Sequence, residues 1–329
     1  MKNIRPDLVY AHNVHHHISY RALTLASNLN IPVVLTLHDA MTINYDRFSQ
    51  GIAMEDLSHC PKIDYQMSNY SNTWSFKDKY LSLRNLIIRK ILYESTQVRV
   101  AVSQELRKLL EINNVQCTHT IHNGVEPKDW ELSQDQVKKF RQKLNLEGEK
   151  IILFGGIISF RKGGEHIVRA LPEIIKIVPN STLLVIGSAE GYALAMLKMA
   201  RKLGVENKLA FTDWLSGSDL IAAYHLSNVV VVPSIYLDPF PTVTLEAMAV
   251  HKPVVATCFG GASEAVIEGK TGYVVNPLNT EEMAKRIIYL LKDEQMAQRM
   301  GKAAYNHLQH NFTLNQSTNK YLSVFEKLL

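Results

Sequence analysis

Short apolar runs alternate with helical stretches along most of this chain, and no other feature restricts the fold as much. Leu8–His12 and Pro32–Asp39 are short enough to be buried strands, and the helical stretch Ser19–Asn28 separates them. Strand, helix and strand in this order is the repeat of a parallel sheet, because parallel strands need a crossover connection. We therefore predict an α/β fold.

The repeat continues towards the C-terminus and predicts a second parallel sheet. Val98–Ser103 is the third strand, and its last residue is the predicted N-cap of a helix over Gln104–Ile112. Asn123 and Gly124 form a dipeptide that is typical of turns. The remaining predicted strands are Thr118–Ile121, Ile151–Phe154, Thr182–Gly187, Lys208–Thr212, Asn228–Pro233 and Pro253–Cys258, and the later helices are Tyr192–Leu203, Asp219–Leu226 and Thr242–Val250.

The length of the chain allows two domains. With 329 residues, of which 46% are apolar, it can form two cores. We place the domain boundary near Gly148, at the end of a polar, charged stretch, so that residues 1–148 form an N-terminal domain and 149–312 form a C-terminal domain. Two doubly wound sheets that face each other leave a cleft between them.

Charge, cysteine usage and hydropathy exclude several classes of protein. The net charge of +5 is spread thinly and accompanies no nucleic-acid motif, so we expect no nucleic-acid partner. Cys60, Cys117 and Cys258 are odd in number and widely spaced, which favours reduced thiols over a disulfide or zinc framework. No apolar run is long enough to cross a bilayer and the start lacks an apolar signal core, so we expect a cytoplasmic protein.

The densest basic segment, Lys77–Lys90, has two interpretations. Leu83 and Ile87 fall on one helical face and Arg84 lies elsewhere, which is typical of an ordinary surface helix. The same pattern fits a helix that contacts anionic lipid, which would make the protein peripheral at the inner membrane face. The polar, aromatic-rich stretch from residue 41 to 80 is either a substrate loop or a simple connection.

Polar residues close the first two predicted strands. His12 and Asn13 end the first, and His38 and Asp39 end the second. Open α/β sheets bind ligands at the carboxyl ends of parallel strands, so these tips are candidates for a functional site. The run of three histidines at 15–17 has no carboxylate or cysteine at a matching spacing, and we expect no metal site there.

A turn with two carboxylates, Asp238 and Glu246, carries the clearest binding chemistry. Two prolines in the turn have no N–H, which leaves Phe240, Thr242 and Val243 as backbone donors at the start of a helix. A helix N-terminus attracts phosphate and sugar hydroxyls, and a carboxylate such as Glu246 can accept two hydrogen bonds from a ribose diol. Taken singly, either carboxylate could equally stabilise the helix or shape the loop.

Two glycine turns support this interpretation. Gly261 opens a short helix whose first turn holds Glu264, and Gly156 precedes Arg161 and Lys162 at the start of another helix. Glycines before a helix with cations beside them favour a diphosphate, although a flexible turn with exposed cations is the alternative. The glycine spacing matches neither a Walker loop nor a dinucleotide fingerprint.

With these residues in place, the chain resembles the retaining glycosyltransferases of family 4, which have the GT-B fold of two Rossmann-like domains. The motifs that carry the resemblance are HNGV, RKGGEHIVRAL, DPFPTVTLEAMAVHKPVVAT, GGASEAV and the tail FTLNQSTNKYLSVFEKLL. The resemblance implies transfer of a hexose-like unit from a nucleotide-diphosphate sugar to a hydroxyl of a carbohydrate or lipid-linked acceptor. It implies retained anomeric configuration and no metal or other cofactor. It also implies that the helix over 313–329 packs back on the N-terminal domain.

The resemblance assigns roles to individual residues. Arg161 and Lys162 would neutralise the donor diphosphate, and Glu246 would hold the donor ribose. His12 would lie beside the anomeric centre, and Asp238 stands where the family usually has a glutamate. The other implied binding residues are Gly156, Phe240, Thr242, Val243, Gly261 and Glu264.

The resemblance starts at a later strand of the family's N-terminal domain, so we expect that domain to be incomplete and its sheet to have an open edge. The main hypothesis is a retaining glycosyltransferase of polysaccharide, lipid-linked oligosaccharide or glycoconjugate assembly. The first alternative is a non-catalytic nucleotide-sugar-binding module or one half of a split enzyme whose partner chain supplies the missing strands. The other is gene truncation or a misassigned start codon.

Overall fold

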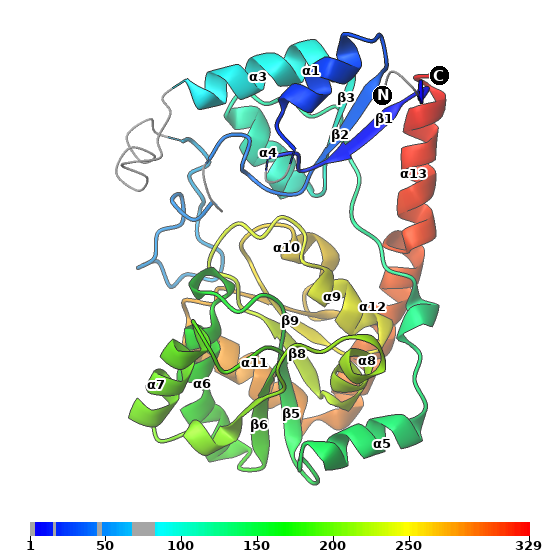
Figure 1. Cartoon of the computed structure of the whole chain (residues 1–329). Helices are drawn as coiled ribbons and strands as arrows, with labels where there is room; N and C mark the ends of the chain where they lie inside the picture. The colour runs from blue at the N-terminus through cyan, green and yellow to red at the C-terminus, as the bar shows by residue number, and fades with distance from the viewer. Residues whose placement is uncertain (1–3, 16–17, 45–47, 68–82) are drawn as a thin grey trace.

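The computed structural model describes residues 4–15, 18–44, 48–67 and 83–329. It contains two α/β units, each built on one parallel sheet, and the chain passes from the first unit to the second and back (Figure 1). The last helix, α13 (Leu314–Glu326), is the element that returns to the first unit. The predicted α/β fold with two parallel sheets is confirmed.

The N-terminal sheet has the strand order β1-β2-β3-β4, and all neighbouring strands are parallel. All residues of β2 are buried, because Val33 and Leu35 share a core with helices α1 and α3 while Val34 packs with α13. In the described part of the chain, β1 has a strand partner on one side only. The strands are β1 (Val9–His12), β2 (Val33–Leu37), β3 (Val98–Ala101) and β4 (His119–Thr120), and the helices are α1 (Arg21–Ser27), α3 (Arg84–Ser95) and α4 (Gln104–Ile112).

The C-terminal sheet has the order β10-β9-β8-β5-β6-β7, again with parallel neighbours. The order reverses between β5 and β8, and ligands bind at such a switch point in doubly wound sheets. Each strand predicted for this sheet overlaps an observed one. The strands are β5 (Lys150–Phe154), β6 (Ser181–Val185), β7 (Leu209–Phe211), β8 (Val229–Val232), β9 (Val254–Thr257) and β10 (Gly272–Val275).

Helices cover both faces of the C-terminal sheet, as a doubly wound fold requires (Figure 1). They are α5 (Gln134–Lys143), α6 (Gly164–Ile177), α7 (Ala193–Lys202), α8 (Gly217–Leu226), α9 (Thr242–Ala249), α10 (Ala262–Ala265), α11 (Thr280–Lys292) and α12 (Glu294–Asn311). Helix α5 precedes the predicted boundary near Gly148 but packs on α8, where Lys143 Nζ lies 2.9 Å from Asp219 Oδ2. The boundary itself stays a prediction.

Helix α13 packs on the face of the N-terminal sheet opposite to α1 and α3. Val324 lies in a core cluster with Val34 and Val100, and the hydroxyl of Tyr321 lies 3.0 Å from Oγ1 of Thr36. The end of the chain is therefore fastened to the unit in which the chain begins. None of the helices in the described ranges is long and apolar enough to cross a bilayer.

The structure tests two local predictions, the helix cap at Ser103 and the turn at Asn123 and Gly124. Ser103 is the N-cap of α4, since its Oγ accepts a hydrogen bond of 3.1 Å from the N–H of Leu106, and this prediction is confirmed. Asn123 and Gly124 form no turn, so that prediction is wrong. A Cβ atom on Gly124 would lie 2.4 Å from the carbonyl oxygen of Thr313. The glycine therefore allows the segment after β4 to lie close to the segment that leads into α13.

Helix α3 overlaps the basic segment 77–90, of which residues 77–82 lie outside the described residues. Its buried apolar side chains are Ile88 and Leu92, and it packs against α1. Leu83 and Ile87 are exposed. The helical face that carries Leu83 and Ile87 is therefore not the face that contacts the core.

Residues 48–67, here called the strap, are irregular and run between the two units (Figure 1). Within the ambiguous stretch 41–80, residues 45–47 and 68–80 lie outside the described residues, as do His16 and His17. The carbonyl of Phe48 accepts a hydrogen bond of 2.8 Å from the N–H of Leu237, so the strap begins on the C-terminal unit.

Candidate functional site

A cavity of about 350 Å³ lies between the two units, at the switch point between β5 and β8. The N-terminal unit contributes the tip of β2, and the C-terminal unit contributes the glycine turn after β5 and the loop after β8. From the first unit and the strap, the lining residues are His38, Asp39, Ala40, Phe48, Val102 and Asn123. From the second unit, they are Gly156, Ile157, Lys162 and the segment Tyr236–Val243.

Lys162 and Asp238 form a buried ion pair in the wall of this cavity. Nζ of Lys162 lies 2.7 Å from Oδ2 of Asp238, and that oxygen also accepts a hydrogen bond of 2.8 Å from the hydroxyl of Ser234. Only 5% of the Asp238 side chain and 14% of the Lys162 side chain are exposed. Asp238 therefore fixes the ammonium group at the cavity, and its own carboxylate is already engaged.

Helix α9 begins at the cavity wall with an open N-terminus. Pro241 precedes it and makes no side-chain cap, and Thr242 and Val243 line the cavity. The N–H groups in the first turn of a helix lack partners within the helix and carry a partial positive charge, so they attract anions. The structure thus places the predicted backbone hydrogen-bond donors of Thr242 and Val243 in the same cavity as the ammonium group of Lys162.

Glu246 lies further along α9 and is held by a tyrosine from α8. The hydroxyl of Tyr224 donates a hydrogen bond to Oε2 of Glu246, and only 1% of Tyr224 is exposed. Burial raises the pKa of the Glu246 carboxyl, while hydrogen bonds from Tyr224 and Thr242 and the charge of Lys162 offset part of that rise. Glu246 is half-buried and is not one of the lining residues.

Gly156 and Gly261 act through their backbone. Gly156 follows β5, has a φ of +107° and lines the cavity, a conformation that glycine adopts without strain. The N–H of Gly261 donates a hydrogen bond of 2.8 Å to the carbonyl of Asp238. A Cβ atom on Gly261 would lie 2.0 Å from the carbonyl oxygen of Pro239. Gly261 therefore supports the Asp238 loop from outside the cavity.

Glu264 faces the N-terminal unit instead of the cavity. Its two carboxylate oxygens accept hydrogen bonds of 2.9 Å from the N–H groups of Gln104 and Glu105, at the start of α4. Nε2 of His122 lies 2.8 Å from the same carboxylate. The expected role of Glu264 was to bind the nucleotide sugar. In the structure its carboxylate is instead stabilised by the N-terminus of α4, and few of its acceptor positions remain free for a ligand.

At the N-terminal wall, His38 lines the cavity and His12 lies beside it. Nδ1 of His12 lies 2.7 Å from Nε2 of His38, and the two rings stack with their centroids 5.0 Å apart. Burial, and then the charge of His12, lower the pKa of His38 to about 4, so His38 is neutral near neutral pH. His12 is therefore one side chain further from the cavity than the resemblance implies.

Hydrogen bonds from the tip of β1 fix the tip of β2. The side-chain amide of Asn13 donates to Oδ2 of Asp39 at 3.1 Å and accepts from the N–H of His38 at 3.1 Å. Burial opposes ionisation of Asp39, but hydrogen bonds from His15 and from the N–H of Met41 outweigh it and lower the pKa of the carboxyl. The N-terminal wall thus presents a neutral imidazole beside an ionised carboxylate.

Arg161 and Phe240 contribute less to the cavity than expected. The carbonyl of Arg161 accepts a hydrogen bond of 2.8 Å from the N–H of Ile235, and Arg161 is not one of the lining residues. Phe240 does line the cavity, but its ring packs against His122, with the centroids 4.7 Å apart, and against Phe312, with the centroids 5.6 Å apart. Among the lining residues, Lys162 is the cation.

Three residues that contribute to the site were not predicted from the sequence. Tyr224 falls in a predicted helix and looks like a core residue, Phe48 falls in the ambiguous stretch, and Asn123 looks like part of a turn. Their roles depend on contacts between segments far apart in the chain. Only Asn123 had a detectable signal, because a polar residue after a buried strand marks a strand tip.

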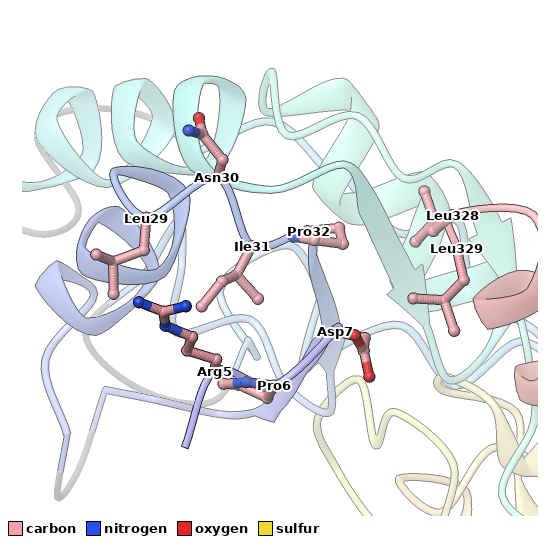
Figure 2. Close-up of a pocket in the computed structure, with 9 residues that line it drawn as sticks. All are labelled: Arg5, Pro6, Asp7, Leu29, Asn30, Ile31, Pro32, Leu328 and Leu329. Atoms are coloured by element: carbon pink, nitrogen blue, oxygen red, sulfur yellow. The ribbon is translucent and has the colours of Figure 1, made fainter. Parts of the chain in front are cut away.

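A second cavity, of about 650 Å³, lies at the amino ends of β1 and β2, away from the strand tips (Figure 2). Its charged side chains are those of Arg5 and Asp7, and it has no glycine turn or helix start of the kind found at the switch point. Over residues 4–15, 18–44, 48–67 and 83–329, no group of three His, Cys, Asp or Glu side chains is arranged to hold a metal ion.

Sequence comparisons place the chain among known proteins. Residues 136–307 match the family described as Glycosyl transferases group 1, and residues 1–129 match Glycosyltransferase Family 4. Spore coat protein SA of Bacillus subtilis is 31% identical over 221 residues, which make up 64% of this chain and 59% of that protein. An uncharacterized glycosyltransferase of Methanocaldococcus jannaschii is 31% identical over 248 residues, 72% of this chain and 62% of that protein. The chain thus spans less than two thirds of each of these relatives.

Solved structures share the fold. HepE of Anabaena in complex with UDP-glucose has a TM-score of 0.76 at 20% identity, over 98% of this chain and 79% of that one. Sucrose-phosphate synthase of Thermosynechococcus elongatus has a TM-score of 0.73 at 22% identity, over 98% of this chain and 73% of that one. These likenesses establish the GT-B fold, with two doubly wound domains about a cleft. With the two family matches along its length, the chain belongs to the group 1 glycosyltransferases, in family 4.

Proposed function

We propose that this chain transfers a hexose-like unit from a nucleotide-diphosphate sugar to an acceptor hydroxyl, with the anomeric configuration retained. The observation that carries the proposal is the cavity at the switch point, where Lys162 and the open N-terminus of α9 converge. A cation beside free backbone donors fits a diphosphate group. The UDP-glucose complex of HepE, which has the same fold, supports this class of donor.

Each residue of the site has a separate role in this proposal. Lys162 and the N–H groups at the start of α9 bind the diphosphate, and Glu246 binds the ribose diol. Asp238 holds Lys162 in place, while Arg161 adds positive charge next to it in the chain. Rate enhancement comes from positioning the donor and from stabilising the charge on the departing diphosphate, so no step needs a metal ion.

The N-terminal wall is the proposed acceptor side. His38 and Asp39 face the donor wall across the cavity, and His12 supports His38. A neutral imidazole and a carboxylate can both accept a hydrogen bond from a hydroxyl group. We propose a carbohydrate or a lipid-linked saccharide as the acceptor.

Calorimetric titration of the full chain with UDP, GDP and ADP tests the donor site. At least one of them is expected to bind, and Lys162→Ala or Glu246→Ala is expected to weaken that binding by on the order of 1–3 kcal/mol, the range for hydrogen bonds to charged groups. Lys143→Ala is the control, because Lys143 lies on α5 and pairs with Asp219 on the surface. A folded wild type that binds none of the three would contradict the donor-site assignment.

A second candidate function is nucleotide-sugar binding without turnover. The position of β1 favours it, because within the ranges that the structure describes β1 pairs with β2 alone and the acceptor side of the cleft rests on that sheet. Release of free nucleoside diphosphate from a bound nucleotide sugar, with and without sugar acceptors, separates the two functions. If the nucleotide sugar binds but no nucleoside diphosphate is released with or without an acceptor, the chain is a binding module or one half of a split enzyme.

We further propose a cytoplasmic protein that contacts anionic membrane through α3. Leu86, Ile87 and Tyr93 are exposed on this helix, as is Leu83 directly before it, and Lys90 lies among them. Apolar side chains next to cations fit the interface of an anionic bilayer. Co-sedimentation with vesicles that contain phosphatidylglycerol is expected for wild type and reduced for Leu86→Glu, and binding that is equal with neutral vesicles would contradict the contact.

A further inference from the structure

The strap is anchored on the C-terminal unit by a buried amide. Nδ2 of Asn276 donates hydrogen bonds of 2.8 Å to the carbonyl oxygens of Asp56 and Ser58, and only 1% of Asn276 is exposed. Nδ2 of Asn279 donates a further hydrogen bond of 3.1 Å to the carbonyl of Leu57. These bonds hold the middle of the strap over the carboxyl end of β10.

The last residues of the strap are anchored on the N-terminal unit. Asn113, at the end of α4, accepts a hydrogen bond of 3.0 Å from the N–H of Met67 and donates one of 2.7 Å to the carbonyl of Tyr65. The hydroxyl of Tyr65 also donates to the carboxylate of Glu105. A segment that is fixed at two places presents the side chains between them in a defined position.

Between these anchors, the thiol of Cys60 meets the thiol of Cys258. Cys258 follows β9, and its N–H donates a hydrogen bond of 2.9 Å to the carbonyl of Val275, so Cys258 lies next to the Asn276 anchor. Cys60 lies two residues after Ser58, whose carbonyl accepts a hydrogen bond of 2.8 Å from this same Asn276, so the anchored strap holds Cys60 beside Cys258. Cys60 is exposed and Cys258 is half-buried. Their separation in the sequence hides this pair, because neither cysteine has a nearby partner in the chain.

We propose that Cys60 and Cys258 are a redox modification site, at which an intramolecular disulfide ties the strap to the C-terminal unit. Cys117 is buried in the core of the N-terminal unit and lies outside the pair. Burial and the neighbouring Cys60 thiol raise the pKa of the Cys258 thiol, whereas Cys60 is exposed to solvent. An oxidant therefore reacts first with Cys60.

The oxidant that we assign is a small-molecule disulfide. The thiolate of Cys60 attacks one sulfur of that disulfide, and the other sulfur leaves as a thiolate. The thiol of Cys258 then loses its proton to solvent, attacks the Cys60 sulfur and displaces the second small thiolate. The two protein thiols are oxidised, the small disulfide is reduced to two thiols, and the two protons lost by the protein are taken up by those thiolates.

The disulfide would restrict one side of the cavity. Gly260, two residues after Cys258, has a φ of +88° and forms a parallel bridge with Asp238, which lines the cavity. Phe48, at the start of the strap, also lines the cavity, and its carbonyl is bonded to the N–H of Leu237, next to Asp238. Oxidation therefore links the strap to the loop system that holds the buried ion pair, and it opposes movement of the strap away from the cavity.

The test treats the full chain with oxidised glutathione and maps its peptides without reduction. The expected product is a cross-linked peptide that contains Cys60 and Cys258, in a protein whose intact mass is lower by two hydrogen atoms and that carries no lasting glutathione. Cleavage by trypsin after Lys62, inside the strap, is expected to be slower in the oxidised protein than in the reduced one, because a tethered segment opens less often.

Three variants make the outcome specific. Cys258→Ser is expected to retain glutathione on Cys60, because the resolving thiol is gone, and Cys60→Ser is expected to form no cross-link. Cys117→Ser is expected to cross-link as the wild type does. Glutathione that persists on Cys60 in the wild type, a cross-link between two chains, or thiols that both remain open to alkylation after oxidation would overturn the proposal. Thermal unfolding of the reduced variants checks that each is folded.

Discussion

The two walls of the cavity are built in different ways. The wall proposed to bind the donor, here called the donor wall, consists mainly of one continuous segment, Tyr236–Val243, together with Lys162. The opposite wall is assembled from the tip of β2, Phe48 of the strap and Asn123 after β4. When one continuous segment forms a wall, the spacing of its residues predicts the chemistry of that wall. When distant segments form it, only the folded structure reveals which residues come together.

The walls also differ in how their charges are balanced. Lys162 and Asp238 balance each other inside the donor wall, at 2.7 Å. In the other wall, the state of His38 depends on burial and on His12 from a neighbouring strand. The donor wall is therefore expected to respond most strongly to loss of a partner, and the opposite wall to acid.

Loss of Asp238 is expected to have the largest effect. Asp238→Ala leaves the ammonium group of Lys162 buried without its carboxylate, and it is expected to lower the free energy of unfolding by about 3–5 kcal/mol. Urea unfolding measures this loss. Asp219→Ala is the matched control, because Asp219 pairs with Lys143 at 2.9 Å on the surface and such pairs contribute about 0–1 kcal/mol. Equal losses in the two variants would show that burial of the pair does not matter.

Acid is expected to act on the opposite wall through His38. Its pKa is 6.5 in the unfolded chain and about 4 in the folded one, because burial and then the charge of His12 lower it. The unfolded state therefore binds more protons, and stability falls as the pH drops from 6.5 towards about 4. His38→Asn is expected to remove on the order of 1–3 kcal/mol of that fall, measured by urea unfolding across this pH range.

The control for acid is His310→Asn, since His310 is an exposed residue on α12. Its pH dependence of stability is expected to match that of the wild type. If His38→Asn also matched the wild type, another group would be responsible for the loss of stability in acid.

The sheets and the donor wall could be predicted from the sequence because their signals are local. Apolar runs and the helical stretches between them indicate the strands of both sheets, and prolines next to a helix start indicate free donors at Thr242 and Val243. The same local signals failed where a tertiary contact decides the outcome. Gly124 looks like a turn residue, but its small size is needed for the approach of Thr313.

Glu264 shows the same limit for a charged residue. A carboxylate in the first turn after two glycines looks the same in sequence whether it faces a ligand or another helix. In the structure it faces α4, a helix from the other unit. Cys60 and Cys258 likewise meet only because the strap folds over β9 and β10.

Glu264 supplies the next prediction, on the contact between the units. Glu264→Ala removes both acceptors from the start of α4 and is expected to lower the free energy of unfolding by about 1–2 kcal/mol, the usual cost of a lost helix cap. Glu111→Ala is the control, because Glu111 pairs with Arg107 at 2.7 Å within the same helix, α4. Small-angle scattering is expected to show a larger radius of gyration for Glu264→Ala alone. An unchanged radius would mean that other contacts hold the units together.

The smallest effect is expected for Tyr224→Phe, and it tests the donor wall through its pH dependence. The hydrogen bond from Tyr224 favours the ionised form of Glu246, so its loss raises a carboxyl pKa that burial has already raised. If the ionised carboxylate binds the ribose, UDP binding by the variant weakens at a higher pH on acidification than binding by the wild type, and its affinity near neutral pH falls by about 1 kcal/mol.

Tyr192→Phe is the control, since Tyr192 donates a hydrogen bond of 2.6 Å to Glu165 outside the cavity. If calorimetry gave the same loss of UDP affinity on acidification for both variants, Glu246 would not bind the donor. The donor wall would then consist of Lys162 and the start of α9.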